Sequence, residues 1–363
     1  MSETKALKQT VSAPDLAKTF GVVIITTLIA IGGFLLLRND SFPQIITTII
    51  AIAWGVSSVA LIFYSLNLLA QAFPTKTYNK IVPYIFVGPA VIILAWYLLI
   101  PTVRSLVFSF MNRDSTKFVG LENYKYLFTD RSMLISIRNT LIWLVCGTAF
   151  SVILGLMAAI LAERSYIEKV GKTFIFLPMS ISLVGAGVIF KFMYSAKFGG
   201  AEQTGLLNAL VVACGGEPNN WLQNAPWNNL FLIAIFVWLQ TGFALVVLSA
   251  ALKAVPDDMI EAARIDGAGE FRILMQVIIP NIRGSIISVS TTILLAALKC
   301  FDIVYSMTNG MFGTEVLASQ QYKQMFTFQN YGRGSAIAIL ILIGVSPVVY
   351  YNLKEFRNRE AFK

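Results

Sequence analysis

Eight long stretches with almost no charged residues constrain the fold of this chain more than any other feature. They cover 20–37, 45–70, 82–103, 139–162, 173–194, 229–252, 284–305 and 334–352. A helix needs ~20 apolar residues to cross a bilayer, and in lipid the backbone must satisfy its own hydrogen bonds, which favours helices. The sequence therefore predicts an all-α integral membrane protein with about eight transmembrane helices. Lys191 and Lys299 make the fifth and seventh stretches the least regular.

Composition supports a membrane protein and argues against several kinds of chemistry. Only 13% of the residues are charged and 56% are hydrophobic, with a mean hydropathy of +0.71. The chain has no histidine, and Cys146, Cys214 and Cys300 lack the spacing of a metal or redox motif. We therefore expect neither a catalytic residue nor a metal site, and we rank a membrane enzyme far below a transport protein.

Basic residues predict the orientation of the chain. Those that decide it are Lys76, Lys80, Arg164, Lys169, Lys172, Lys253, Arg264, Arg272, Arg283, Lys354, Arg357, Arg359 and Lys363. With eight spans they share one side with the basic N-terminus, and the positive-inside rule makes that side cytoplasmic. Both termini are thus predicted to be cytoplasmic. A basic cluster in the third loop opposes this orientation, but Asp114, Glu122 and Asp130 dilute it. The net charge of +9 is a topology signal, and we expect no nucleic-acid partner.

A charged segment, "VPDDMIEAARIDGAGEFRILMQVIIP", separates the sixth and seventh stretches. Pro256 suits a first helical turn, Asp257 and Asp258 favour the helix dipole, and Gly267 suits the left-handed position after a helix. A second short helix is expected to run to Pro280. These features predict a helix–turn–helix elbow on the cytoplasmic face. The physical properties of this segment alone fit a solvated hairpin between spans and a docking segment for a partner protein equally well.

The segment "EKVGKT", residues 168–173, ends like a phosphate-binding P-loop. Tyr166 occupies the place of the required first glycine, and no strand precedes the segment. We therefore reject nucleotide binding here, so any ATP must be handled by another chain.

The elbow closely resembles the EAA motif of the permeases of binding-protein-dependent ABC importers. The matching positions are Glu261, Ala262, Ala263, Asp266, Gly267, Ala268 and Pro280. A second segment, "LKCFDIVYSMTNG", resembles the signature of the carbohydrate permeases, with matches at Lys299, Phe301, Asp302, Ile303, Tyr305, Thr308 and Gly310. The resemblance covers residues 80–353 and is to the MalF-like permease of importers for sugars or osmolytes such as glucosylglycerol. Where the family has Gly-Gly-Pro this chain has "NGMFG", a local departure that could alter the outer gate.

This resemblance implies an architecture and a set of partners. It implies a permease domain of six helices at 81–353, an N-terminal two-helix membrane extension at 1–80 and a cytoplasmic tail at 354–363. The partners would be a second permease subunit, two ATP-binding cassette subunits and an extracytoplasmic solute-binding protein. ATP and Mg would bind in the partner subunits, with no cofactor in this chain.

The resemblance also implies a mechanism of alternating access. Closure of the ATP-binding subunits would move the elbow and rock the spans between inward- and outward-open states. The implied coupling residues are Glu261, Ala262, Ala263, Asp266, Gly267 and Ala268. Glu261 would pair with a basic residue of the partner, and Gly267 would permit the close turn.

The family places solute contacts on the spans that flank the elbow, and here those spans carry aromatic and hydrogen-bonding side chains. The candidate path residues are Trp238, Gln240, Thr241, Phe243, Lys299, Asp302, Tyr305 and Asn309. Aromatic faces and polar groups together suit a sugar, although Trp238 fits ordinary packing equally well. Lys299 and Asp302 are three residues apart and can pair on one helix face, either in the path or to hold the span in place.

The competing interpretation is an ion-coupled secondary transporter, which would use intramembrane carboxylates as relays. Asp302 is almost the only such carboxylate, and it is expected near the outer end of its span. The elbow also has no purpose in that mechanism. An importer should need ATP, whereas a secondary carrier should need only an ion gradient.

Overall fold

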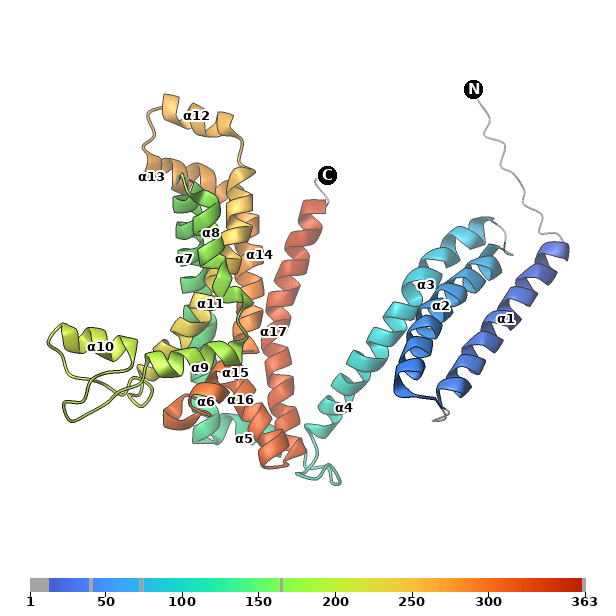
Figure 1. Ribbon diagram of the computed structural model, residues 1–363, viewed down its shortest axis with the longest axis horizontal. Coiled ribbons are helices and arrows are strands. Elements are labelled where there is room, and N and C mark those ends of the chain that lie inside the picture. Colours follow the sequence, from blue (N-terminus) through green and yellow to red (C-terminus); the bar gives the residue numbers. More distant parts are fainter. Residues whose placement is uncertain (1–12, 39–41, 72, 74, 164–165, 361–363) are drawn as a thin grey trace. The chain divides into compact units, whose positions relative to one another are not determined.

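A computed structural model describes residues 13–38, 42–71, 73, 75–163 and 166–360. Within these residues the chain is almost entirely helical (Figure 1), and its one isolated β-bridge joins Met111 and Phe118. The predicted all-α fold is confirmed. The chain forms two compact units, Met1–Val103 and Arg104–Lys363.

Three long helices make up most of the first unit. They are α1 (Ala13–Leu37), α2 (Gln44–Gln71) and a continuous helix of α3 (Thr75–Leu94), the π-helical turn η1 (Ala95–Leu99) and α4 (Ile100–Phe108), which runs on into the second unit. The hydroxyls of Thr26 and Ser65 share a buried hydrogen bond of 2.7 Å between α1 and α2. Most other side chains of these helices are apolar and exposed, as expected where helices face lipid. The domain boundary predicted after residue 80 concerns the extent of the permease-like core, and it stays a prediction.

The second unit contains the remaining helices in four consecutive groups. The first group is α5 (Glu122–Thr129), α6 (Arg131–Ile142), the π-helical turn η2 (Trp143–Gly147) and α7 (Thr148–Glu163). The second is α8 (Glu168–Phe176), the 3₁₀ turn η3 (Leu177–Ser180), α9 (Leu183–Met193) and α10 (Leu206–Ala213). The third is α11 (Asn228–Lys253), α12 (Asp257–Ile265), α13 (Glu270–Ile273), the π-helical turn η4 (Leu274–Ile278) and α14 (Ile279–Leu298). The fourth is α15 (Asp302–Met307), the 3₁₀ turn η5 (Met311–Gly313), α16 (Leu317–Tyr322), the π-helical turn η6 (Lys323–Thr327) and α17 (Tyr331–Glu360).

Seven helices in the described residues are long and apolar enough to cross a membrane, and a bent pair of helices makes an eighth candidate. The predicted fifth span, 173–194, is therefore not one straight helix. Its two parts, Glu168–Ser180 and Leu183–Met193, meet at 101°. The bend arises because Ser182 has an extended backbone and caps a new helix, its hydroxyl accepting a hydrogen bond from the Gly185 amide at 3.0 Å.

The predicted seventh span, 284–305, has the wrong ends. The helix runs from Glu270 to Leu298, and Lys299 is the residue that caps it. A new short helix, α15, then begins at Asp302. The hydropathy pattern predicted an end of this span that is too late, because apolar residues lie on both sides of the break.

α11 forms the core of the second unit together with α7, α8 and α14, which all pack against it. It is apolar around its whole circumference, as expected of a helix surrounded by protein. Its buried Phe236 meets Trp143 of η2 edge to face, with ring centroids 5.8 Å apart. Gly155 of α7 lies so close to Ala244 that a Cβ on residue 155 would overlap the alanine methyl group. Small residues thus set the distance between these two spans.

The second unit has two distinct ends (Figure 1). α12 and α13 lie at one end, and α5, α6, α15 and α16 lie at the opposite end, beside the start of α17. A smaller buried cluster holds that second end together and consists of Leu127, Met133, Leu317, Ala336 and Ile337. The elbow and the loops around α15 therefore lie at opposite ends of the helix bundle.

Candidate functional site

α12 is the first helix of the predicted elbow, and its ends carry opposite charges. Pro256 has an extended backbone and stands just before the helix, which begins at Asp257, one residue later than the sequence suggested. Asp257 and Asp258 occupy the first turn and Arg264 the last. Each charge therefore complements the helix dipole at its own end.

The turn after α12 has the geometry that the sequence predicted for Gly267. This glycine has φ +77°, in the left-handed region. The Ala268 amide donates to the Ala263 carbonyl at 3.0 Å, and the Gly267 amide donates to the Arg264 carbonyl at 3.0 Å. These two bonds form a Schellman motif, which satisfies the last carbonyl groups of the helix. The left-handed C′ position of Gly267 is confirmed.

α12 has an exposed face and a partly buried face. Glu261, Ala262 and Ile265 share the exposed face, and the Ile265 side chain is 86% exposed. Ile260 and Ala263 are half-buried on the opposite face, toward the bundle. The helix thus stands at the end of the bundle (Figure 1), with an exposed face that combines an acidic, a small and a large apolar side chain.

The second helix of the elbow is longer than predicted. α13, η4 and α14 form one helical span, Glu270–Leu298, which continues through Pro280. Proline lacks an amide hydrogen and crowds the preceding turn, and the π-helical turn η4 lies immediately before α14 at this point. The widened turn accommodates Pro280, so the helix does not end there.

A cavity of about 630 Å³ lies beneath the elbow. Its apolar part comes from Ile160, Leu252, Val255, Ile260, Phe271, Ile273, Leu274 and Ile278, and its charged part from Glu163, Lys253, Asp257, Arg264 and Glu270. Arg264 and Glu270 form an ion pair of 3.1 Å across the Gly267 turn. This pair links the two helices of the elbow across its turn, and α12 lies over the cavity.

A network of charged side chains joins three spans near the elbow, and the sequence analysis missed it. Glu168 of α8 ion-pairs with Lys172 at 2.5 Å and with Lys253 of α11 at 2.5 Å. The Ser249 hydroxyl donates to Glu163, at the end of α7, at 3.0 Å and also contacts Lys172. Lys172 of the P-loop-like segment is thus engaged in an ion pair on a helix. The i, i+4 spacing of Glu168 and Lys172 was the signal that could have predicted this pair.

The four candidate path residues on α11 fall on two faces of that helix. Trp238 and Thr241 are one turn apart, and Gln240 and Phe243 form a second pair one turn apart. Trp238 packs edge to face on Phe190 at 5.2 Å, with 37% of its side chain exposed. The Thr241 hydroxyl donates to a backbone carbonyl of its own helix at 2.7 Å, whereas Gln240 and Phe243 are half-buried. Because the two pairs lie on different faces of α11, a solute that contacts one face of this helix would touch one pair more readily than all four residues.

The candidate residues after the elbow lie around the break that follows α14. Lys299 caps α14 and Asp302 is the first residue of α15, so the two do not share a helix face and the proposed pairing on one face is wrong. Tyr305 stacks on Phe301 at 4.8 Å, with 44% of its side chain exposed. Asn309 follows α15 with a left-handed backbone, φ 49°.

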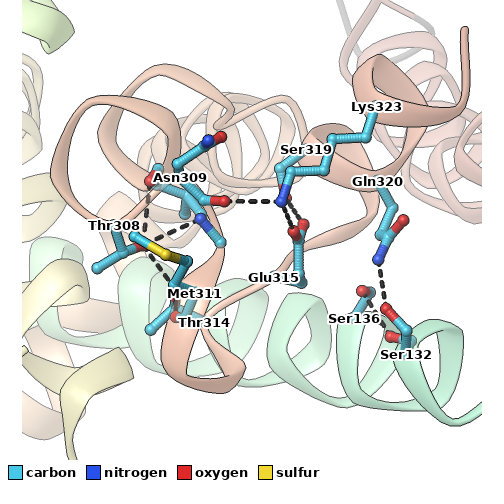
Figure 2. A network of polar contacts seen from close by, with 12 residues as sticks. Ser132, Ser136, Thr308, Asn309, Met311, Thr314, Glu315, Ser319, Gln320 and Lys323 are labelled. Atoms are coloured by element: carbon cyan, nitrogen blue, oxygen red, sulfur yellow. Dashed lines mark hydrogen bonds and ion pairs between the residues drawn. The ribbon is translucent and has the colours of Figure 1, made fainter. Parts of the chain in front are cut away.

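A polar network at the end opposite the elbow holds α15 and α16 together (Figure 2). Lys323 donates to the Asn309 carbonyl at 2.7 Å and ion-pairs with the buried carboxylate of Glu315. Glu315 also accepts a hydrogen bond of 2.6 Å from Ser319. The sequence analysis missed this ion pair because its two charges lie eight residues apart, across a loop whose path no local pattern predicts. In the described residues, no three histidine, cysteine or acidic side chains gather in a metal-binding arrangement.

Comparison with known proteins agrees with this architecture. Residues 151–359 match the family described as "Binding-protein-dependent transport system inner membrane component". The chain is 49% identical over 278 residues to the osmoprotective compounds uptake permease protein GgtC of Synechocystis sp., a match that covers 77% of this chain and 100% of that protein. It is 43% identical over 325 residues to the alpha-glucoside transport system permease protein AglF of Rhizobium meliloti, covering 86% and 97% of the two chains.

A solved structure shares the fold. A chain of a bacterial ABC transporter involved in the import of the acidic polysaccharide alginate aligns with a TM-score of 0.67 at 20% identity, covering 78% of this chain and 99% of that one. The family match covers more than half of the sequence and includes the elbow. The chain therefore belongs to the binding-protein-dependent transport system inner membrane components, the permease subunits of ABC importers.

Proposed function

We propose that this chain is a MalF-like permease that imports a sugar or a sugar-derived osmolyte by alternating access, driven by ATP hydrolysis in partner subunits. The elbow carries the proposal. It presents Glu261, Ala262 and Ile265 on an exposed helix face, and the turn at Gly267 closes that helix compactly. Such a face at the end of a bundle suits insertion into a groove of another protein.

The proposed assembly contains a second permease, two ATP-binding cassette subunits and an extracytoplasmic solute-binding protein. ATP and Mg bind in the cassette subunits. The coupling surface of this chain consists of Glu261, Ala262, Ala263, Asp266, Gly267 and Ala268. The elbow and both termini lie on the cytoplasmic side of a bacterial inner membrane. Residues 1–80 form a membrane extension, and residues 354–363 form a cytoplasmic tail.

The coupling role is tested by Glu261→Lys in the reconstituted complex. We expect ATP-driven uptake to be lost while membrane insertion stays normal, because the reversed charge would repel the basic residue that we propose as the partner of Glu261. Glu202→Lys, the same reversal in an exposed loop before α10, is the matched control. Near-normal uptake by the Glu261 variant would remove this residue from coupling.

The solute class rests on the side chains along the proposed path and on the relatives. Aromatic rings and hydrogen-bonding groups together suit sugar rings and hydroxyls, and GgtC and AglF are named for uptake of osmoprotective compounds and alpha-glucosides. The path residues that we propose are Trp238, Gln240, Thr241, Phe243, Lys299, Asp302, Tyr305 and Asn309. A screen of glucosylglycerol, sucrose, trehalose and maltose for stimulation of ATPase activity, with the binding protein present, would identify the solute.

The α11 part of the path is tested by the double substitution Gln240→Ala, Phe243→Ala. Because these residues share one half-buried face, we expect solute transport to change while the subunits still assemble. An unchanged transport rate and unchanged apparent solute affinity would exclude both residues from the path.

Family membership supports the importer over the ion-coupled carrier, since binding-protein-dependent systems define the family. Uptake into proteoliposomes separates the two directly. The importer requires ATP, the cassette subunits and the binding protein, and it should be insensitive to an imposed ion gradient. Gradient-driven uptake by this chain alone would overturn the proposal.

A further inference from the structure

The loop between α15 and α16 carries an unusual amount of backbone strain at its tip, Asn309–Gly313. Asn309, Gly310, Phe312 and Gly313 all have positive φ angles, of 49°, 73°, 59° and 73°. Glycine tolerates this region freely, but a phenylalanine there is strained because its Cβ crowds the backbone. Strain of this kind persists only where the surroundings fix the conformation.

Two buried amides fix the backbone of the tip. Asn139 of α6 donates to the carbonyls of Gly313 and Glu315 at 2.7 and 2.8 Å. Asn228 of α11 donates to the Phe312 carbonyl at 2.8 Å. The side chains of both asparagines are fully buried, so α6 and α11 together hold the loop from beneath.

The ion pair of Glu315 and Lys323 also fixes this loop, because Lys323 donates to the Asn309 carbonyl as well (Figure 2). Gly310 packs directly on the Glu315 carboxylate, where any side chain at 310 would overlap it. The hydroxyls of Thr308 and Thr314 close the base of the loop with a hydrogen bond of 2.6 Å. The tip is thus a rigid structure that buried polar contacts hold in place.

The side chains presented by this rigid tip are apolar. Met311 is 58% exposed and Phe312 is 44% exposed, and no charged residue lies between Asn309 and Gly313. A strained backbone that projects a methionine and a phenylalanine outward suits contact with another protein, because both residue types are enriched at the centres of protein interfaces. Rigidity also lowers the entropy lost on binding.

We propose that Met311 and Phe312 form an apolar peg that docks into the solute-binding protein. The inference rests on the proposed function, since it takes the binding protein as the partner. The tip joins α15 to α16 at the end of the bundle opposite α12 (Figure 1), and we propose that the cassette subunits bind at the α12 end. The family depends on a binding protein, which must meet the permease at that end.

The test uses Phe312→Gly in the complete complex, held in lipid nanodiscs. Glycine removes the ring and relieves the strain, because it accepts φ 59° freely. We expect the thermal midpoint of the complex to stay equal or rise, while the Kd for the solute-loaded binding protein rises roughly tenfold, the loss typical of an interface anchor. Met311→Ser should also raise this Kd. A ring that only stabilised the fold would lower the midpoint instead.

Phe198→Ala, at a 57% exposed phenylalanine in the loop before α10, is the matched control and should leave the Kd unchanged. Wild-type Kd values for both tip variants would overturn the peg, while binding-protein-stimulated ATPase activity in the same preparations would leave the proposed function standing. Loss of the second permease from purified Phe312→Gly complexes would also overturn the peg, since the tip would then join the two permeases. A wild-type complex that no binding protein stimulates would overturn both proposals.

Discussion

Lys253, the last residue of α11, ion-pairs with Glu168, the first residue of α8, at 2.5 Å. Lys253 stands just before the loop that leads into α12, so this pair fixes the point from which the elbow starts. Because α8 is the first half of the bent span, the pair also connects the elbow to that span. The second half of the span, α9, packs on α15. The charged network is therefore placed to fix the position of the elbow relative to the spans.

We predict that Lys253→Glu lowers the thermal stability of the complex and its ATP-driven uptake, because two carboxylates would then meet at residue 168. The double variant Lys253→Glu, Glu168→Lys restores opposite charges and should recover much of both. Thermal unfolding and uptake assays measure the two effects. Lys169→Glu, an equal charge change at the next and exposed position of α8, is the control. Equal damage in the single and double variants would show that the pair has no specific role.

Gly267 gives a second prediction. Gly267→Ala places a Cβ on a backbone with φ +77°, at a cost of about 1–2 kcal/mol to the turn after α12. We expect binding-protein-stimulated ATPase activity to fall while the transporter still assembles. Gly269→Ala is the matched control, since that glycine has φ −69° and open space around it. The prediction fails if the two alanine variants behave alike.

Gly242 gives a third prediction, which concerns packing of α11 on α8. A Cβ at this position would stand 2.7 Å from the Ile175 carbonyl oxygen and 2.9 Å from the Phe176 Cα, both backbone atoms. Gly242→Ala should therefore destabilise the protein by about 1–3 kcal/mol through overpacking. Gly171→Ala, in α8 with open space around it, should instead stabilise by about 0.5–1 kcal/mol. Differential scanning fluorimetry tests whether the two substitutions change the unfolding midpoint in opposite directions.

The buried amide of Asn139 gives a fourth prediction. Asn139→Asp removes both donors and leaves acceptor oxygens facing the carbonyls of Gly313 and Glu315. We expect a loss of stability on the order of 2 kcal/mol or more. Asn224→Asp, at an exposed asparagine before α11, should cost far less. Equal unfolding midpoints for the two variants would show that Asn139 does not hold the loop between α15 and α16.

Sequence patterns predicted the spans and the elbow because both are governed by local physics. A long apolar run must become a helix in lipid, and "DG" followed by small residues ends a helix whatever surrounds it. The left-handed Gly267 follows from such local rules. The start of α12 was placed to within one residue for the same reason.

The breaks within apolar segments could not be predicted in this way. The bend at Ser182 lies among residues whose hydropathy barely changes. Lys299 and Asp302 are charged, but apolar residues precede and follow them, so hydropathy alone did not separate α14 from α15. Lys299 and Asp302 were expected on one helix face because their spacing was right, but the break between them removes that face. The Glu315–Lys323 pair and the buried amides depend on contacts distant in sequence, which a single sequence does not display.

The bend between η3 and α9 has a consequence for biogenesis. Thirteen helical residues before it and eleven after it reach only about 20 Å and 17 Å, well short of a hydrocarbon core of ~30 Å. Neither half can settle in lipid by itself, because the non-helical backbone between them needs shelter from protein. That shelter includes α11 and α15, which the ribosome makes later. We therefore expect this segment to stay at the translocon until its neighbours emerge, so that insertion of this region depends on the later helices.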